Sequence, residues 1–455
     1  MKILHYSLGF PPFRTGGMTK YCIDLMKAEK GNGHEVGLMW PGHFAILDKS
    51  TLHIKKHNAI EGCFNYELVN PMPVPLLDGI KDIEPFIESR SEDIFLGFFK
   101  KNSFDVLHVH TLMGLPKECI IAAKKANVRT VFTSHDYFGL CPKCSFMFGD
   151  IACKEGKTCI DCTQCNKTAL SQKKIELMQS ALYKQIKQLS IIKKLRRRHI
   201  QSVNASYQAV SWITDRRSVN QSDINKYARL RQYYVSIFEQ MDVIHFNSNN
   251  TRKIFEQYFD VSRNGTVVTI SNGEIEDRKA LKKGIVQNKE IRIGYLGPQS
   301  IRKGFFELVD CLDALAADYK NFKLVTYSGL LDREYAECHE PYSYSELPNV
   351  MHDMDFLVVP SKWNETFGFT VLEAFSYGIP AIVSDTVGAK DLIQPNCSGF
   401  IYRTQDELQQ ILKKLFDNPE KIQQMNRFIV ENVPIKTMII HEAEIEALYK
   451  GSEQK

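Results

Sequence analysis

The stretch that decides the fold is residues 355–385, DFLVVPSKWNETFGFTVLEAFSYGIPAIVSD. An apolar run ends at Pro360, a polar loop follows, and a second apolar run begins after Pro380. Short apolar runs on both sides of a helical segment are typical of a strand, helix, strand unit in a parallel sheet. Ligands bind such sheets at the carboxyl ends of the strands, so the loop after Pro360 is a candidate binding site.

Two acids mark this loop and the helix after it. Glu365 lies in the loop and Glu373 about one turn into the helix, so both carboxylates are expected to line one crevice at different depths. Carboxylate oxygens accept hydrogen bonds from sugar or ribose hydroxyls. Phe367, Gly368 and Phe369 form the turn into the helix, where free N–H groups can meet a phosphate or sugar oxygen. The alternative is a solvated helix with two incidental acids, which the loop, glycine and helix context disfavours.

The same alternation of strands and helices recurs along the chain. Residues 2–8, 34–40, 106–110 and 130–133 read as strands of one sheet, and IRIGYLG, KLVTYSG, DFLVVP and AIVSD read as strands of another. The charged stretch 273–290 separates the two sets. The pattern predicts an α/β fold of two Rossmann-like, doubly wound parallel-sheet domains. One continuous sheet is the alternative, and single α/β domains of this size are uncommon.

Composition excludes several classes of protein. With 455 residues, 44% hydrophobic and 24% charged, the chain is too long for one small binding module and too apolar to be disordered. A net charge of +5 is weak for a nucleic-acid binder of this size. The opening MKILHYSLGF does not have the shape of a signal peptide, and we find no apolar run of the ~20 residues that a membrane-spanning helix needs. We therefore expect a cytoplasmic protein.

A glycine pair follows the first predicted strand. Gly16 and Gly17 lie between that strand and a helix, where backbone N–H groups and the helix dipole favour a phosphate. Glycine pairs in such turns are often structural, so the signal is weak on its own.

The motif ETFGFTVLEA, followed by GIPAIVSD, resembles the E-x7-E signature of retaining glycosyltransferases of family four, also called glycosyltransferase group 1, which have the GT-B fold. The resemblance extends to MKILHYSLGFPPFRTGGMTKY, DVLHVHT, the His-Asp pair after VFTS, FNSNNTRKIF, Asn272-Gly273 and Lys303-Gly304. It implies an acceptor-side domain at 1–285 with an insertion at about 141–240, a nucleotide-sugar domain at 286–430, and a final segment, 431–455, whose helix packs back on the first domain.

The resemblance also implies roles for single residues. Glu365 would contact the transferred sugar, Glu373 the ribose hydroxyls, and Lys303 the diphosphate, while Gly16 and Gly17 would lie at the phosphate or the acceptor. A lysine suits the diphosphate because it neutralises the charge that grows as the nucleotide leaves. The family usually has an arginine where this chain has Pro298, and whether Arg302 supplies that contact is open.

Three histidines lie near predicted strand ends. His135 follows the strand TVFTS and faces the expected cleft between the domains, and in the family a histidine here touches the donor sugar. It could instead cap its loop through a hydrogen bond. His108 and His110 alternate on one strand and share a face, which favours packing or the orientation of loops over catalysis.

The segment 141–165 holds six cysteines. Cys141, Cys144, Cys162 and Cys165 fit the C-x2-C-x17-C-x2-C spacing of a structural zinc site with four thiolates. The C-x2-C-x2-C run also resembles iron–sulfur ligation, but the usual fourth cysteine and its proline are missing after Cys165. Unligated thiols are the third possibility. A closed four-thiolate site leaves no position for a substrate, so no catalytic role follows.

Basic charge gathers in residues 173–199, which we expect to form one amphipathic helix. This segment has nine Lys or Arg and the single acid Glu176, a balance of +8 that leaves −3 for the rest of the chain. Such a helix suits an anionic membrane surface or a lipid-linked pyrophosphate acceptor. It can equally bury its apolar stripe on the first domain and leave its lysines in water.

Taken with the resemblance, these features favour a retaining glycosyltransferase that moves a sugar from a nucleotide diphosphate sugar to a saccharide in surface polysaccharide synthesis, and we expect that acceptor to be lipid-linked. It would work in the cytoplasm or on the inner face of the cell membrane. No Asp-x-Asp motif stands in a convincing position, so we expect no metal cofactor for the chemistry, only the structural zinc. Two alternatives remain open, a sugar-nucleotide epimerase with the same fold and a non-catalytic zinc-bearing interaction protein.

Overall fold

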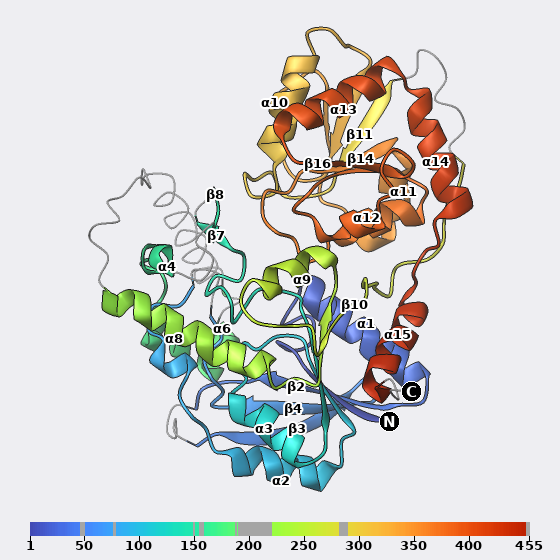
Figure 1. Cartoon of the computed structure of the whole chain (residues 1–455). Coiled ribbons are helices and arrows are strands. Elements are labelled where there is room, and N and C mark those ends of the chain that lie inside the picture. The colour runs from blue at the N-terminus through green and yellow to red at the C-terminus, as the bar shows by residue number, and fades with distance from the viewer. Residues whose placement is uncertain are drawn as a thin grey trace.

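The computed structural model describes residues 1–45, 51–75, 79–148, 151–153, 159–186, 189, 221–281 and 290–451. Two α/β domains are stacked on each other, with the amino-terminal domain at the bottom of Figure 1 and the carboxyl-terminal domain at the top. Both ends of the chain lie on the amino-terminal domain.

An eight-stranded sheet forms the centre of the amino-terminal domain, in the order β10-β9-β6-β5-β1-β2-β4-β3. All neighbours are parallel except β3 and β4, which form a hairpin. The strands are β1 (Lys2–Tyr6), β2 (Glu35–Pro41), β3 (His53–Ile60), β4 (Cys63–Val69), β5 (Val106–Val109), β6 (Arg129–Thr133), β9 (Val243–Phe246) and β10 (Gly265–Val267). The chain runs outward from β1 in both directions, so a topological switch point lies between β1 and β5.

Helices cover this sheet, and their apolar faces complete its core. They include α1 (Gly17–Gly31), α2 (Glu92–Asn102), α3 (Lys117–Lys125) and α9 (Asn249–Glu256), besides the short 3-10 turn η1 (Glu84–Phe86). Residues Tyr21, Cys22, Leu25 and Met26 of α1 recur at helical spacing and are buried, as the sequence predicts.

A six-stranded parallel sheet forms the carboxyl-terminal domain, in the order β13-β12-β11-β14-β15-β16. Its strands are β11 (Ile291–Tyr295), β12 (Phe322–Thr326), β13 (Ala336–Cys338), β14 (Phe356–Val359), β15 (Ala381–Ser384) and β16 (Gly399–Tyr402). Its helices and 3-10 turns are α10 (Phe305–Leu315), η3 (Tyr344–Glu346), α11 (Leu347–His352), α12 (Phe369–Ser376), η4 (Gly388–Leu392), α13 (Gln405–Asp417) and α14 (Glu420–Asn432). Its switch point lies between β11 and β14.

The segment between β6 and β9 is inserted between two neighbouring strands of the first sheet. It contains the hairpin β7 (Met147–Phe148) and β8 (Ile151–Ala152) and the helices α4 (Ile160–Cys165), α5 (Gln172–Met178), α6 (Ala181–Ile186) and α8 (Gln221–Phe238). Helix α8 buries Tyr227, Leu230, Tyr234 and Phe238 in the domain core.

The expectation of one helix over 173–199 is wrong in its described part. The segment breaks between α5 and α6, where the Gln179 carbonyl accepts from the Phe44 amide at 3.3 Å and the Gln179 side chain accepts from the Val74 amide at 3.0 Å. These contacts tie Gln179 to the segments that follow β2 and β4, and the helix ends there. Ile175 is buried, whereas Leu182 and Leu189 are exposed. Residues 190–199, with the basic run at 193–198, lie outside the described residues.

The last helix, α15 (Met438–Lys450), leaves the carboxyl-terminal domain and packs against α1 and β6 of the amino-terminal domain (Figure 1). One apolar cluster joins the two domains and this helix, with Tyr21 from the first domain, Phe367 and Val371 from the second, and Ile445 and Tyr449 from α15. The two sheets are therefore held together by a shared hydrophobic interface.

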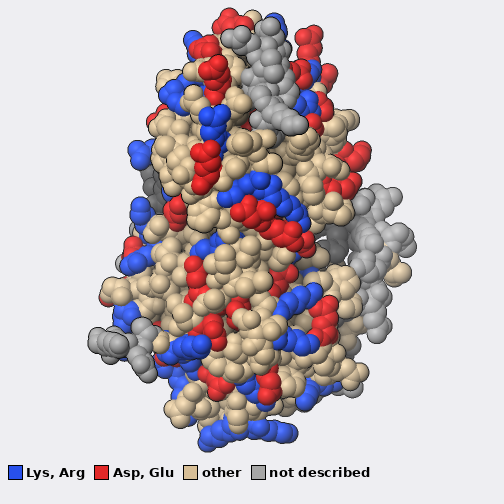
Figure 2. All heavy atoms as spheres, turned by 90° about the vertical axis from the view of Figure 1, so that its right-hand side faces the viewer, with Lys and Arg blue, Asp and Glu red and all other residues tan. Residues whose placement is uncertain are grey.

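Charges of both signs are interspersed over the face shown in Figure 2, across both domains. This mixing agrees with the weak net charge. Among the described residues, no helix is both long and apolar enough to cross a membrane.

Candidate active site between the two domains

Glu365 is held at the switch point of the carboxyl-terminal sheet. Its amide donates to the Thr386 carbonyl at 3.0 Å, and its carbonyl accepts from the Gly388 amide at 3.0 Å. These contacts fix the loop after β14 against the segment after β15. The Glu365 residue is 8% exposed, and its Oε1 lies 2.9 Å from Nζ of Lys303.

Lys303 reaches Glu365 because Gly304 allows a close approach of two loops. Gly304 has φ 68°, and a Cβ on it would lie 1.6 Å from the Pro360 carbonyl oxygen. Only glycine fits this position. The Cζ of Arg302 and the Nζ of Lys303 each lie 5.3 Å from the centroid of a Trp363 ring. Arg302 and Lys303 therefore flank the same Trp363 side chain, and a phosphate contact by Arg302 stays a prediction.

Glu373 lies on α12 and is 4% exposed. The Tyr344 hydroxyl donates to its Oε1 at 2.8 Å. Burial raises the pKa of Glu373, against the opposing effects of the Tyr344 hydrogen bond and the charge of Lys20. Lys20 comes from α1 of the other domain, with its Nζ 5.0 Å from the centroid of the Tyr344 ring. The second acid of the motif therefore faces both domains.

The glycine loop of the amino-terminal domain meets the turn into α12. Gly16 has φ 118° and Gly17 begins α1. A Cβ on Gly17 would lie 3.8 Å from the Phe369 ring, so the loop and the turn face each other directly. Gly368 precedes α12, and Phe367 is buried in the cluster that joins the domains. The structure brings the two predicted ligand-binding turns together.

His135 lies at the carboxyl end of β6, beside the Glu365 loop. Its carbonyl accepts from the Thr366 hydroxyl at 3.2 Å, and its Nε2 lies 3.2 Å from Nδ1 of His110. Burial, reinforced by nearby His245 and His441, lowers the pKa of His135 to about 3. His135 is therefore neutral at physiological pH. His108 and His110 lie in the interior with ring centroids 4.2 Å apart, which confirms that they share a face.

Three residues at this site were not selected from the sequence. Lys20 lies in the opening stretch that carries the resemblance, which implies no role for it, and Tyr344 lies in no motif. Only the fold brings both side chains to Glu373. Asp136 follows His135, and its Oδ1 accepts from the Phe138 amide at 2.8 Å. Burial raises the pKa of Asp136 to about 6. In the sequence, only the His-Asp dipeptide at 135–136 indicates Asp136.

The four predicted zinc ligands lie in the insertion between β6 and β9. Burial raises the pKa of the Cys144 thiol, and it raises the pKa of Cys165 to about 12. The Cys162 Sγ lies 4.0 Å from Nη2 of Arg231. In the described part of the chain, the groups of three side chains close enough to share an ion do not include these cysteines. The zinc site stays a prediction.

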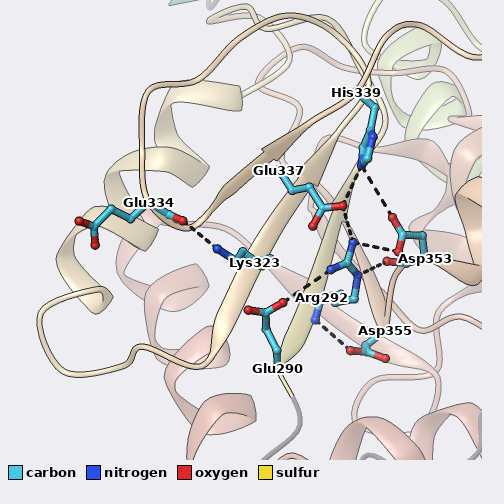
Figure 3. A network of polar contacts seen from close by, with 8 residues as sticks. All are labelled: Glu290, Arg292, Lys323, Glu334, Glu337, His339, Asp353 and Asp355. Carbon is cyan, nitrogen blue, oxygen red and sulfur yellow. Dashed lines mark hydrogen bonds and ion pairs between the residues drawn. The ribbon is translucent and has the colours of Figure 1, made fainter.

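Three groups of side chains among the described residues are close enough to share a metal ion. Two of them belong to a histidine cluster at the first sheet, and the third lies on the carboxyl-terminal domain. The latter is Glu337, His339 and Asp353, and Figure 3 shows that Arg292 occupies its centre. Arg292 Nη2 lies 2.8 Å from both Glu337 Oε1 and Asp353 Oδ1, and its hydrogen bond lowers the pKa of Glu337. This network ties β11 to β13 and to the segment before β14, which is a structural role.

The carboxyl-terminal part of the chain is similar to a known family. Residues 276–429 match the family described as glycosyl transferases group 1. The chain is 24% identical over 138 residues to an uncharacterized 41.2 kDa protein in the cps region of Klebsiella pneumoniae, a match that spans 29% of this chain and 38% of that protein.

Similar solved structures cover nearly the whole chain. They include sucrose-phosphate synthase from Thermosynechococcus elongatus (TM-score 0.57, 13% identity, 99% of this chain and 98% of that one). HepE of Anabaena in complex with UDP and glucose has a TM-score of 0.54 and 13% identity, and the match covers 99% of this chain and 100% of that one. The lipopolysaccharide outer core galactosyltransferase WaaB has a TM-score of 0.58 and 13% identity, and the match covers 98% of this chain and 99% of that one. The protein has the GT-B fold of the glycosyltransferases.

Proposed function

We propose that the protein is a retaining glycosyltransferase that moves a sugar from a nucleotide diphosphate sugar to a hydroxyl of a saccharide acceptor in surface polysaccharide synthesis. The observation that carries this proposal is the joint placement of Lys303, Glu365 and Glu373 around one switch point, facing the Gly16-Gly17 loop of the other domain. Cation, acid and helix terminus are the groups that a sugar diphosphate requires.

Each residue then has a role set by its chemistry. Lys303, with Arg302 beside it, stabilises the leaving diphosphate, and the N–H groups at the start of α12 bind phosphate or sugar oxygens. Glu373 accepts from the ribose hydroxyls, displacing the Tyr344 hydroxyl. Glu365 contacts the transferred sugar, and His135 approaches it from the first domain.

The similar structures support this assignment of the donor. HepE of Anabaena was solved with UDP-glucose, WaaB is a lipopolysaccharide outer core galactosyltransferase, and WaaG is a glycosyltransferase involved in lipopolysaccharide biosynthesis. The curated relative lies in a cps region. A lipid-linked saccharide is the acceptor that we propose, because the exposed Leu182 and Leu189 and the basic run at 193–198 suit a membrane surface.

A donor screen tests the function. The wild-type protein is incubated with UDP-, GDP- and ADP-sugars, with and without lipid-linked saccharides, and both nucleotide release and labelled product are measured. The Glu365→Gln variant gives the background. Transfer that depends on an acceptor supports the proposal, and the anomeric configuration of the product decides retention.

The screen also separates the alternatives. A sugar-nucleotide epimerase would convert the donor sugar without an acceptor. A non-catalytic protein would release no nucleotide above the Glu365→Gln background with any donor, and that result would reject the proposal.

A further inference from the structure

Three buried side chains of the amino-terminal domain bring metal-binding atoms together from separate elements. His5 lies on β1, Cys22 on α1 and His110 directly after β5, and one ligand atom of each lies within 4.8 Å of those of the other two. His5 and His110 are 0% exposed, and Cys22 is 1% exposed. Imidazole nitrogens combined with a thiolate are typical ligands of thiophilic transition metals. We call these three side chains the buried His-Cys cluster.

The two imidazoles of the cluster face each other through one nitrogen each. His5 Nδ1 lies 3.0 Å from His110 Nε2. Imidazole nitrogens bind an ion such as zinc at about 2.0–2.1 Å, so two of them on one ion lie about 3.3–3.6 Å apart. An ion between these nitrogens therefore requires them to separate by only about 0.3–0.6 Å.

The other nitrogen of each ring has a hydrogen-bond partner outside the cluster. His5 Nε2 lies 2.6 Å from Glu29 Oε2, and His110 Nδ1 lies 3.2 Å from His135 Nε2. The Tyr449 hydroxyl in turn donates to Glu29 Oε1 at 2.7 Å. Histidines that bind a metal through one nitrogen usually have such a partner at the other, which fixes the orientation of the ring. Both rings are therefore held with their inner nitrogens toward each other.

The two other groups of possible metal ligands are already filled by protein atoms. In the group of His5, Glu29 and His108, the Tyr449 hydroxyl lies 2.7 Å from Glu29 Oε1 and 2.6 Å from His108 Nδ1. In the group on the carboxyl-terminal domain, the cation of Arg292 occupies the centre. A metal ion would have to displace these contacts, so the buried His-Cys cluster is the best candidate of the three.

Sulfur makes this cluster suitable for a soft ion. Cys22 Sγ contacts a second sulfur, Met26 Sδ, at 3.9 Å, and Met26 is 1% exposed. Two imidazoles, a thiolate and a more distant thioether are the ligand set typical of copper, whereas zinc sites use cysteine, histidine and carboxylates. A monovalent copper ion and one thiolate also cancel in charge, so the ion adds no net charge to the interior.

We propose that His5 Nδ1, Cys22 Sγ and His110 Nε2 bind one monovalent copper ion, with Met26 Sδ as a weaker fourth donor. Binding forms two copper–nitrogen bonds and one copper–thiolate bond, and the thiol proton of Cys22 leaves to solvent. The copper stays monovalent throughout. It joins β1, α1 and the end of β5 at the switch point of the first sheet, so its role is to stabilise the amino-terminal domain.

The charge states of the ligands agree with this site. Burial raises the pKa of the Cys22 thiol, so the cysteine is protonated and uncharged when no ion is bound. Burial lowers the pKa of His110, so its imidazole is neutral, which is the form that binds metals. The interior therefore holds no unpaired charge on these groups with or without copper.

The copper content of two alanine variants tests the proposal. The full-length wild type, Cys22→Ala and Cys119→Ala are produced with copper in the growth medium, so that the ion is present while the buried ligands fold around it. Each protein is washed with a chelator of monovalent copper, and the copper per chain is measured. Cys119 is the matched control, because it is 0% exposed in the same domain, on α3.

Wild type and Cys119→Ala should hold equal amounts of copper, and Cys22→Ala about one ion per chain less. The cysteines at 141–165 are present in all three proteins, so copper that they bind does not contribute to this difference. Bound copper should also raise the melting temperature of the wild type and of Cys119→Ala more than that of Cys22→Ala. Equal copper content in all three proteins would overturn the proposal.

Nuclear magnetic resonance of ¹⁵N-histidine in the wild type gives a test that does not depend on a variant. Copper should change the ring-nitrogen signals of two histidines. The segment 141–165 contains no histidine, so copper on its cysteines leaves these signals unchanged. Unchanged histidine signals, or the same changes with zinc in place of copper, would overturn the assignment. None of these measurements requires transfer activity, so they stand apart from the test of the proposed function.

Discussion

The Nζ of Lys303 lies 2.9 Å from Oε1 of Glu365, so the cation of one loop and the acid of the next meet across the switch point of the carboxyl-terminal sheet. This pair exists without a ligand. A diphosphate carries more negative charge than one carboxylate and would compete for the ammonium group. Under the proposed function, we therefore expect donor binding to release Glu365 toward the sugar.

Lys303→Met should lower transfer about 10²–10³-fold, because it removes the cation that stabilises the leaving diphosphate. The measurement is kcat/KM for the donor at saturating acceptor. Lys362→Met is the matched control, since Lys362 is another lysine of these loops and pairs with Glu307 at 2.7 Å. Near-native turnover in Lys303→Met would show that this lysine does not hold the diphosphate.

Glu373→Gln should have two effects: it should weaken donor binding, and it should stabilise the folded protein. Loss of a charged hydrogen-bond acceptor costs about 1.5–3 kcal/mol, so the KM for the donor should rise roughly 10- to 100-fold. Burial raises the pKa of Glu373 in the folded state, so stability falls as pH rises through that pKa, and the neutral amide avoids this loss. The melting temperature at pH 7.5 should therefore rise. The exposed Glu431→Gln should change neither quantity.

Asp136→Asn should stabilise the protein above pH 6 and not at pH 4. Burial raises the folded pKa of Asp136 to about 6, so the folded protein holds a proton that the unfolded chain releases near its reference value of about 3.9. The wild type therefore loses stability as pH rises between these values. Melting temperatures of both proteins at pH 4 and 7.5 check this. If the difference in melting temperature between Asp136→Asn and the wild type does not grow with pH, that result would be evidence against a buried, protonated Asp136.

The purified protein should contain about one zinc per chain, bound by Cys141, Cys144, Cys162 and Cys165. Because burial raises the pKa of the Cys165 thiol to about 12, zinc binding should release protons and weaken as pH falls. Elemental analysis of the wild type and of Cys144→Ser checks the content, with Cys397→Ser, an exposed cysteine far from the segment, as the control. Iron in place of zinc would indicate a cluster, and neither metal would leave free thiols.

The segment 173–199 should bind the protein to anionic vesicles. Each cation near an anionic surface contributes up to ~1 kcal/mol, and screening over ~10 Å at 0.1 M salt should weaken the attachment. Co-sedimentation with vesicles compares the wild type with a variant in which Lys193, Lys194, Arg196, Arg197 and Arg198 are glutamine. A control with Lys100, Lys101, Lys413, Lys414 and Arg427 changed removes the same charge elsewhere. Binding that is equal in all three proteins would reject the membrane role.

Much of the fold could be predicted because its strands are short apolar runs that end in glycine or proline. The runs around Pro360 and Pro380 give β14 and β15 within a residue or two. The hairpin of β3 and β4 could not be predicted in this way, since β3 (His53–Ile60) is largely exposed and polar. The break at Gln179 depends on hydrogen bonds to Phe44 and Val74, which are far away in sequence.

The candidate site was predictable where one motif carries it. Glu365 and Glu373 are separated by seven intervening residues within a strand, loop, helix unit, so the local pattern places both. Lys20 and Tyr344 reach Glu373 only through the packing of two domains, and no spacing in the sequence relates them. The same holds for Glu29 and Tyr449, which are 420 residues apart and share one hydrogen bond.

The docking of α15 on the amino-terminal domain means that this domain, although it is translated first, cannot complete its folding first. Domains generally form from the amino terminus as the chain emerges. Here Tyr449 supplies the partner of Glu29 and of His108, both in the earliest part of the chain to be made. Until residue 449 has left the ribosome, these buried groups have an unmet hydrogen bond, which costs about 1–3 kcal/mol for each group. The half of the protein that is translated first is therefore the half whose interior closes last.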